Sequence, residues 1–236
     1  MTMGFSLLVH GQSKSGKSYL ADTAPAPRLI LDAEGGASTR FTPSRKVVWN
    51  PATDAPPVAD GTWDSCVVYV RSFTDVQKAY DWLNSGKHDF NSVVIDSLSE
   101  TQQRCVDALV GSDQMKTQDW GELLRKMSTL VRSYRDLIIH PTKPLQVVCF
   151  IAMTKESQEG VKRPYVQGQL ASTLPYYVDV VGYLWTEPTD TGEQVHRLLC
   201  SPHPSFEAGD RTGKLGSVLE EPNIDSMLGM IYSTQR

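Results

Sequence analysis

The stretch GQSKSGKS, from Gly11 to Ser18, decides the fold of this chain. It matches the pattern GxxxxGK[ST], whose glycines let backbone N–H groups turn inward around phosphate oxygens without a clash from Cβ. The apolar run Phe5–His10 precedes it, and a helical stretch, Lys17–Thr23, follows it. A strand, this loop and the N-terminus of a helix, in that order, are the arrangement in which the pattern binds phosphate. The stretch therefore predicts a phosphate-binding loop.

Each part of this loop has an expected role at a nucleotide. Lys17 is expected to reach the β- and γ-phosphates, and the hydroxyl of Ser18 to bind Mg²⁺. The predicted cofactors are therefore ATP and Mg²⁺. The residues expected to contact the nucleotide are those of the loop and the one that follows it: Gly11, Gln12, Ser13, Lys14, Ser15, Gly16, Lys17, Ser18 and Tyr19.

A second apolar run supplies the carboxylate that such a loop needs. The sequence FNSVVIDS, from Phe90 to Ser97, has the pattern of a buried strand closed by Asp96. An acidic side chain in that position is costly unless it meets a cation or hydrogen-bond donors. Asp96 is therefore predicted to hold the magnesium ion through water. The alternative is that Asp96 only caps the next helix.

Short β-rich runs alternate with helical stretches, which predicts an α/β fold with a mainly parallel central sheet flanked by helices. Helices are predicted to begin at Lys17 and near Thr74, Ser97, Thr117 and Ile224. With 236 residues, we expect one domain over residues 1–236, in which the proline-containing segment 51–61 is a surface loop or insertion. Strands are predicted at Phe5–His10, Arg28–Asp32, Val67–Val70, Ser92–Asp96, Leu145–Ala152, Val178–Trp185 and Gln194–Cys200.

The residue that activates water distinguishes the kinds of phosphate-loop ATPase. In many AAA-type ATPases a glutamate directly follows the strand-ending aspartate, but here that position is Ser97. Glu34 lies in LDAEGG, just after the predicted strand Arg28–Asp32, at the sheet edge where open α/β folds bind ligands. Glu34 is thus a candidate base facing the γ-phosphate. Glu100 is the alternative, although one turn into a helix it is typical of an N-terminal helix charge.

The runs LDAEGG and VVIDSLSE, at this spacing, resemble the strand-ending glutamate and the Walker B strand of RecA-like ATPases. With the phosphate loop they resemble the compact phage RecA-like ATPases, including the Sak-type single-strand annealing proteins. The resemblance is firmest over residues 5–36 and 90–100. It implies a RecA-like P-loop NTPase core, an ATPase that acts on single-stranded DNA in phage-type recombination, annealing or replication, and Glu34 as the base.

The same resemblance implies roles for three further residues. Thr154, just beyond the strand ending at Ala152, is expected to sense the γ-phosphate, and the alternative is a plain strand end. The segment GDRTGKLG, from Gly209 to Gly216, is similar to the segment that RecA-like hexameric helicases send into a neighbour's ATP site. Arg211 or Lys214 is therefore expected to stabilise phosphate charge in trans, which implies a homo-oligomer. The alternative for Arg211 and Lys214 is a solvated glycine turn.

The polar segment 154–169 is the expected contact with single-stranded DNA. RecA-like proteins bind single strands through mobile loops after the strand that carries the sensor. The segment holds Lys155, Lys162, Arg163 and Tyr165, which can contact phosphates and stack on a base. The alternative is an ordinary surface hairpin with Pro164 in its turn.

Composition limits the remaining classes. The chain has a net charge of −4, which excludes a uniformly basic DNA-coating protein but leaves room for a local basic path. No apolar run is long enough to cross a membrane, and the N-terminus does not resemble a signal peptide. The four cysteines are far apart and form no zinc-binding pattern. We therefore expect a cytoplasmic protein without membrane partners.

Two other functions remain open. Nucleotide and small-molecule kinases also use a phosphate loop in a chain of this length, but they add an arginine-rich lid, and no run here reads as one. A nucleotide-dependent switch or assembly protein with little turnover is the third hypothesis. ATP hydrolysis stimulated by single-stranded DNA would favour the first function, phosphate transfer to a small acceptor the second, and tight binding without hydrolysis the third.

Overall fold

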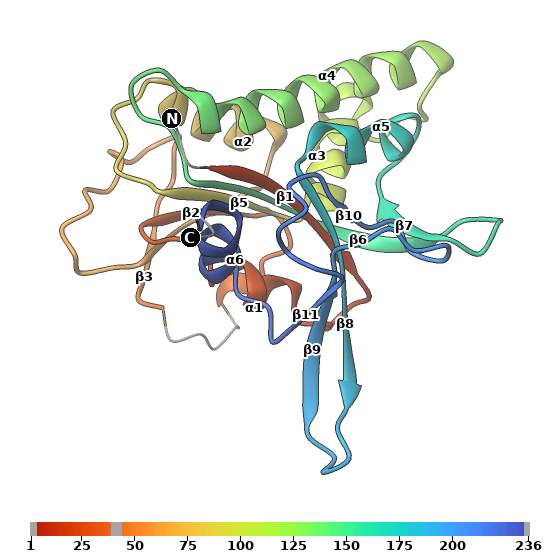
Figure 1. Ribbon diagram of the computed structural model, residues 1–236. Helices are drawn as coiled ribbons and strands as arrows, with labels where there is room; N and C mark the ends of the chain where they lie inside the picture. The colour runs from red at the N-terminus through yellow and green to blue at the C-terminus, as the bar shows by residue number, and fades with distance from the viewer. Residues whose placement is uncertain (1–3, 39–43, 234–236) are drawn as a thin grey trace.

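A large twisted sheet forms the centre of the computed structural model, which describes residues 4–38 and 44–233 (Figure 1). Its strands are β1 (Phe5–Gly11), β2 (Arg28–Asp32), β3 (Lys46–Val48), β4 (Ser65–Tyr69), β5 (Ser92–Asp96), β6 (Val147–Glu156), β7 (Lys162–Tyr165), β8 (Val180–Pro188), β9 (Gln194–Leu199), β10 (Gly209–Asp210) and β11 (Val218–Glu220). Their order across the sheet is β11-β9-β8-β1-β6-β5-β2-β4-β3, with β10 paired to β8 and β7 to β6.

The strands from β8 to β3 run parallel to one another, whereas β7, β9, β10 and β11 are antiparallel additions. Strand β6 lies between β1, which leads into the phosphate loop, and β5, which ends in Asp96. The loop and Asp96 therefore both lie at the carboxyl edge of the sheet, one strand apart. The predicted α/β fold with a mainly parallel central sheet is confirmed.

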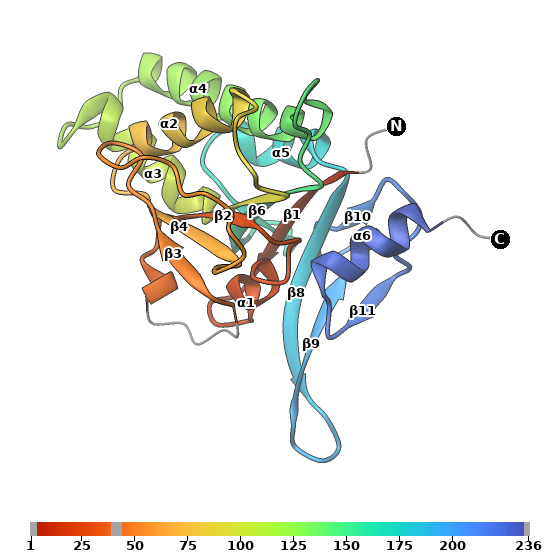
Figure 2. The same ribbon diagram turned by 90° about the vertical axis from the view of Figure 1, so that its left-hand side faces the viewer.

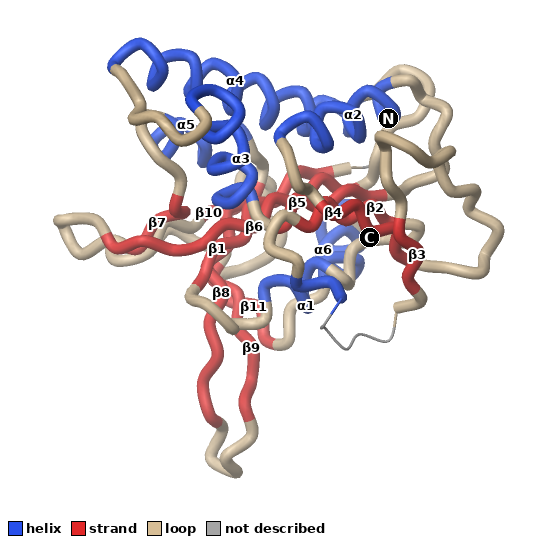
Figure 3. The backbone as a smooth tube through the Cα atoms, turned by 180° about the vertical axis from the view of Figure 1, so that it is seen from behind, coloured by secondary structure: helices blue, strands red, loops and turns tan. Residues whose placement is uncertain are grey.

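Helices cover both faces of the sheet (Figure 3). One face carries α2 (Phe73–Asn84), α3 (Leu98–Val110), α4 (Thr117–Asp136) and α5 (Leu170–Tyr177), and the other carries α1 (Lys17–Ala21) and α6 (Ile224–Tyr232). Two short 3₁₀ turns complete the helical elements, at Gly36–Ser38 and Leu137–Ile139. None of the helices among the described residues combines the length and the apolar character needed to cross a bilayer.

The buried hydrophobic residues form two clusters, one on each face of the sheet, and the alternation of side chains along β1 explains why. Leu8 packs into the larger cluster, beneath α2 to α5, whereas Leu7 and Val9 belong to the smaller cluster beneath α1 and α6. Because successive side chains of a strand point to opposite faces, one apolar run can build both layers. The run is buried throughout, as expected for a strand in the middle of a sheet covered on both faces.

Two hairpins extend beyond the parallel core. Strands β8 and β9 form a long arm that projects away from the body of the molecule (Figures 1 and 2). Strand β6 continues past Ala152 to Glu156 and pairs with β7, so residues 154–165 of the segment 154–169 form a hairpin, as the alternative interpretation of that segment had it. Pro164 lies in β7, opposite Thr154, rather than in the turn, so its predicted position was wrong. Residues 51–61 form no helix or strand.

Candidate nucleotide-binding site

The phosphate loop connects β1 to α1 and has the backbone shape that its sequence predicts. Gly16 has a φ of 89° and Lys14 a φ of 65°, in the left-handed region that orients successive N–H groups inward. A Cβ at Gly11 would overlap the carbonyl oxygen of Leu184 in β8, and a Cβ at Gly16 would overlap the ring of His196 in β9. Both positions therefore require glycine.

Two polar side chains of the loop fit an anion. Ser15 Oγ is buried and has no hydrogen-bond partner among the described residues, a costly state that a phosphate oxygen would relieve. Lys17 Nζ donates to the carbonyl oxygens of Gly11 (3.0 Å) and Gln12 (2.7 Å), so the ammonium group lies folded over the loop. Burial lowers the pKa of Lys17, and the carboxylates of Glu34 and Asp96 act in the opposite direction.

Glu34 is held at this edge by the strand residue before it. The carboxylate of Asp32, which is buried, accepts hydrogen bonds from the backbone N–H groups of Glu34 (3.2 Å), Gly35 (2.8 Å), Gly36 (3.3 Å) and Ala37 (2.7 Å). Asp32 also stands opposite Asp96 in the register of β2 and β5. Glu34, Asp96 and Lys17 thus share one edge, as predicted. Asp32 was not among the expected site residues, although a strand ending in Asp before two glycines is a usable signal.

In the turn after β5, Asp96, Ser97 and Glu100 have different roles. Ser97 is the residue that caps α3, because its Oγ accepts the N–H of Glu100 (3.3 Å), so the alternative in which Asp96 provides that cap does not hold. Asp96 is buried at the end of β5. Glu100 forms an ion pair with Arg104 in the next turn of the helix (3.1 Å). This arrangement favours Glu34 over Glu100 as the group that faces a nucleotide.

Thr154 is bonded to the residue that precedes the phosphate loop. Burial lowers the pKa of His10 to about 4, so the ring is neutral at pH 7. The carbonyl of Glu207 can only accept, so His10 Nε2–H donates to it (2.7 Å), and Nδ1 must accept from Thr154 Oγ1 (2.9 Å). While this bond stands, Thr154 cannot donate its proton to a phosphate. Its expected sensor role stays a prediction, and its contact with the loop passes through His10.

Arg211 and Lys214 lie at the opposite edge of the sheet. Strand β10 pairs with the start of β8, and the phosphate loop lies beside the later part of β8. Arg211 pairs with Asp179 (3.3 Å) and donates to the carbonyl of Tyr176 (3.1 Å). The backbone N–H of Lys214 donates to Asp210 of β10 (3.0 Å), so both residues are held at this end of the sheet, away from the phosphate loop of their own chain. The predicted action in trans, on a neighbour's nucleotide, stays a prediction.

Tyr19 and His196 form a wall beside the loop that only the fold brings together. Their rings are nearly parallel, with an interplanar angle of 19° and centroids 6.3 Å apart. His196 was not among the expected site residues. No local pattern could have found it, because β9 reaches the loop through tertiary contact alone.

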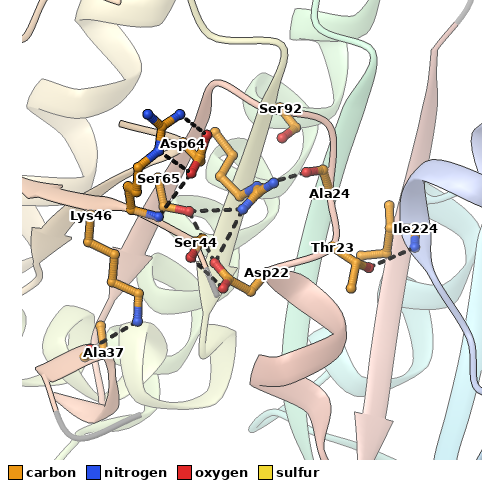
Figure 4. A network of polar contacts seen from close by, with 12 residues as sticks. Asp22, Thr23, Ala24, Ala37, Ser44, Lys46, Asp64, Ser65, Ser92 and Ile224 are labelled. Carbon is orange, nitrogen blue, oxygen red and sulfur yellow. Dashed lines mark hydrogen bonds and ion pairs between the residues drawn. The ribbon is translucent and has the colours of Figure 1, made fainter. Parts of the chain in front are cut away.

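The far end of α1 is anchored by a polar network (Figure 4). Asp22 accepts hydrogen bonds from Ser44 Oγ (2.6 Å) and Ser65 Oγ (3.1 Å) and pairs with Arg28 (3.4 Å). Thr23 Oγ1 accepts the N–H of Ile224, the first residue of α6 (2.8 Å). These bonds fix the short helix α1 to β2, β4 and α6. The N-terminus of α1, which carries Lys17 and Ser18, is thereby held against the loop.

A cavity of about 520 Å³ opens beside Glu34. Its lining includes Asp32, Glu34, Tyr69, Arg71 and Arg104. Two guanidinium groups next to a candidate base are a suitable setting for a second anionic group.

A comparison with models of protein families found a match. The model of a family described as an AAA domain matches residues 3–212, which includes the phosphate loop, Glu34 and Asp96. The search of curated proteins found no match.

Proposed function

The chain belongs to the AAA domain family, whose domain is a nucleotide-binding P-loop ATPase, and from that premise we propose that it is a Mg²⁺-dependent ATPase that acts on single-stranded DNA. One observation carries the ATPase proposal: Lys17, Glu34 and Asp96 converge on a loop in which Ser15 Oγ is buried without a partner. The DNA substrate, the RecA-like type and a role in phage-type recombination, annealing or replication go beyond the family match and belong to the proposal.

Each site residue has one role in the proposed reaction. Lys17 and the backbone N–H groups of the loop bind the β- and γ-phosphates, and Tyr19 and His196 border the nucleotide. Ser18 and Asp96 are the residues that would hold Mg²⁺, which would offset phosphate charge. Glu34 orients a water molecule and accepts its proton. No cluster of three or more potential ligands from His, Cys, Asp and Glu occurs among the described residues, which suits an ion held largely by phosphates and water.

The decisive measurement is ATP hydrolysis with and without single-stranded DNA, on the wild type and on Lys17→Ala. We expect hydrolysis that saturates with added DNA in the wild type and is absent in the variant. Equal turnover in Lys17→Ala would remove the site assignment. Hydrolysis that does not respond to DNA would remove the DNA part of the proposal.

The cavity with Arg71 and Arg104 favours one second candidate, a nucleotide or small-molecule kinase. In that function the two arginines would bind an anionic acceptor beside Glu34. Transfer of the γ-phosphate to a small acceptor, with no response to DNA, would favour the kinase over the DNA-dependent ATPase.

We also propose that the active form is a homo-oligomer in the cytoplasm. Arg211 and Lys214 are held away from the phosphate loop of their own chain and would act on a neighbour's nucleotide, and the ion pair of Arg211 is exposed enough to exchange partners at little cost. All four cysteines are buried and free, in keeping with a reducing compartment. Light scattering with ATP and DNA present tests the assembly, and a monomer with full ATPase activity would exclude it.

A further inference from the structure

An aromatic pocket lies on the face of the sheet opposite α1. It is separate from the site formed by the phosphate loop. Its volume is about 480 Å³, and its walls come from β7, β8, β9, β11 and the connection that follows β9. The main lining residues are Lys162, Tyr183, Trp185, Leu199, His203 and Phe206. This volume is within the roughly 300–1,000 Å³ typical of small-molecule pockets.

Ring faces rather than aliphatic groups dominate the pocket. Phe206 and Tyr183 are 4.4 Å apart between centroids, and Tyr183 and Trp185 are nearly parallel at 17° and 6.1 Å. His203 lies 4.9 Å from Phe206. Tyr183 is buried, whereas Trp185 and Phe206 are half-buried and open to solvent. Planar, partly exposed rings are the surfaces on which unpaired bases stack.

One cation of the pocket lies over its rings. Lys162 Nζ lies 5.3 Å from the ring centroid of Phe206 and 5.9 Å from that of Tyr183. Carboxylates on these strands are held in ion pairs with arginines. Glu207 shares an arginine of β7 with Glu159 (3.6 and 3.7 Å), and Glu187 shares an arginine of β9 with Glu220 (2.5 and 3.4 Å). Lys162 therefore supplies the pocket with a cation that can meet a phosphate next to a stacked base.

The pocket wall is fixed in place and joined to the nucleotide site. The N–H of Lys162 donates to the carbonyl of Ser205 (2.9 Å), and the N–H of Glu207 donates to the carbonyl of Lys162 (2.9 Å). The carbonyl of Glu207 accepts from His10, the residue before the phosphate loop. A ligand that shifts the connection after β9 would therefore act on the loop through one hydrogen bond.

We propose that this pocket binds a base of single-stranded DNA, stacked on Phe206 and Trp185, with Lys162 on the adjoining phosphate. The inference rests on the proposed function, because it locates the strand on which the proposed ATPase acts. It differs from the expectation that the polar segment after β6 holds the DNA on its own. The other face of the β6–β7 hairpin carries Lys155 over the ring of Tyr165, at 5.5 Å, with Arg163 opposite Lys155 in the register. That face has two cations but one described ring contact, whereas the pocket side has several rings.

The test is the affinity for a short fluorescein-labelled oligo-dT, measured by anisotropy without nucleotide. Phe206→Leu and Trp185→Leu each remove a ring face while keeping apolar volume, and we expect each to weaken binding roughly ten- to a hundredfold. Phe206→Tyr should restore wild-type affinity. Lys162→Gln should weaken binding and lower the slope against salt by about one. Thermal unfolding of each variant checks that it is folded.

Matched control variants distinguish binding in the pocket from binding elsewhere on the protein. Tyr176→Leu removes a ring that is 79% exposed and lies outside the pocket, and it should bind like the wild type. Tyr165→Leu and Lys155→Gln alter the other face of the hairpin and should also leave the affinity unchanged. If these two lose affinity while Phe206→Leu does not, the pocket proposal is overturned. It is also overturned if the wild type does not bind oligo-dT, or if free dTMP binds as tightly.

The Lys17→Ala variant separates this inference from the proposed function. It should bind oligo-dT like the wild type, because the pocket and the phosphate loop are different sites. If the wild type does not hydrolyse ATP but its DNA binding is lost in Phe206→Leu, the ATPase proposal fails and the pocket stands. If DNA stimulates hydrolysis equally in the wild type and in Phe206→Leu, and both bind DNA with equal affinity, the ATPase proposal stands and the pocket proposal fails.

Discussion

The two ends of β1 and β8 differ in how their polar groups are satisfied. At the carboxyl end, Ser15 Oγ has no partner among the described residues, and Lys17 donates to carbonyl oxygens of its own loop. At the amino end, Ser6 and Asp179 exchange four hydrogen bonds. Ser6 N–H and Oγ–H donate to Asp179 Oδ2 (2.9 and 2.7 Å), and Asp179 N–H donates to both Ser6 Oγ (3.0 Å) and the carbonyl oxygen of Ser6 (3.1 Å). Arg211 adds an ion pair to Asp179.

This difference separates a binding edge from a structural edge of the same strands. Polar groups that satisfy one another add to stability and have little capacity left for a ligand. Groups held in place without a full set of partners are available to bind one, at some cost to stability. Substitutions at the carboxyl end should therefore change activity, and substitutions at the amino end should change the free energy of unfolding.

The largest expected effect is that of Lys17→Ala on ATP hydrolysis. The variant removes the cation that meets the β- and γ-phosphates, and groups of this kind contribute about 10²–10³-fold or more to turnover. We expect hydrolysis to fall by at least about 10³-fold, with an unfolding midpoint that is unchanged or raised. Steady-state phosphate release measures the loss, and Lys87→Ala, an exposed lysine far from the loop, is the matched control. A comparable loss in Lys87→Ala would contradict the assignment.

Glu34→Gln should have the next largest effect, on hydrolysis but not on binding. The amide keeps the shape and the backbone bonds to Asp32 but cannot accept the proton of water, and such bases contribute about 10²–10⁴-fold. We expect ATP to bind normally and turnover to fall by about 10²–10³-fold. Glu100→Gln is the control and should hydrolyse normally. If Glu100→Gln is inactive and Glu34→Gln is active, the base is at the start of α3 instead.

Much of this carboxyl edge could be predicted from sequence because its signals are local. Strands β2 and β5 begin and end where predicted, since each is a short apolar run closed by an aspartate. The phosphate loop was located by its glycines and lysine. These features depend on residues that are close together in the sequence, so a local sequence pattern is enough to predict them.

The parts that could not be predicted depend on distant contacts. Strands β7, β10 and β11 are short and partly polar, and each exists only because a partner strand is beside it. Helix α5 contains Pro175, which argues against a helix in any local reading, and packing beneath α4 overrides that preference. The aromatic pocket lies between β7 and β9. It could not be predicted either, because its walls come from segments that are distant in the sequence.

A smaller effect should follow from the buried histidine at the carboxyl end of β1. Burial lowers the pKa of His10 from 6.5 to about 4, so between these values the unfolded chain binds a proton that the folded chain does not. Stability is therefore full above pH 6.5 and falls as the pH drops toward 4, by about 3 kcal/mol from this residue. Urea unfolding at several pH values measures it.

His10→Gln is the variant that isolates this effect. Glutamine can donate to Glu207 and accept from Thr154 without titrating, so its stability should depend less steeply on pH below 6.5. His88, whose pKa burial also lowers to about 4, keeps its own contribution in that variant. An unchanged pH dependence in His10→Gln would show that the ring is protonated, or exposed, in the folded state.

The smallest expected effect is at the amino end, where Asp179→Ala tests the structural edge. The variant leaves the N–H of Ser6 buried without its acceptor and removes the ion pair of Arg211, which should cost about 2 kcal/mol of unfolding free energy. Arg211→Ala is the matched control: its side chain is 61% exposed, so loss of the pair should cost less than about 1 kcal/mol. Urea unfolding distinguishes the two.

Because the phosphate loop is at the other end of the strands, nucleotide affinity should be the same in Asp179→Ala as in the wild type. A loss of affinity there would mean that the two edges are coupled through β1 and β8, and the separation between a binding edge and a structural edge would not hold.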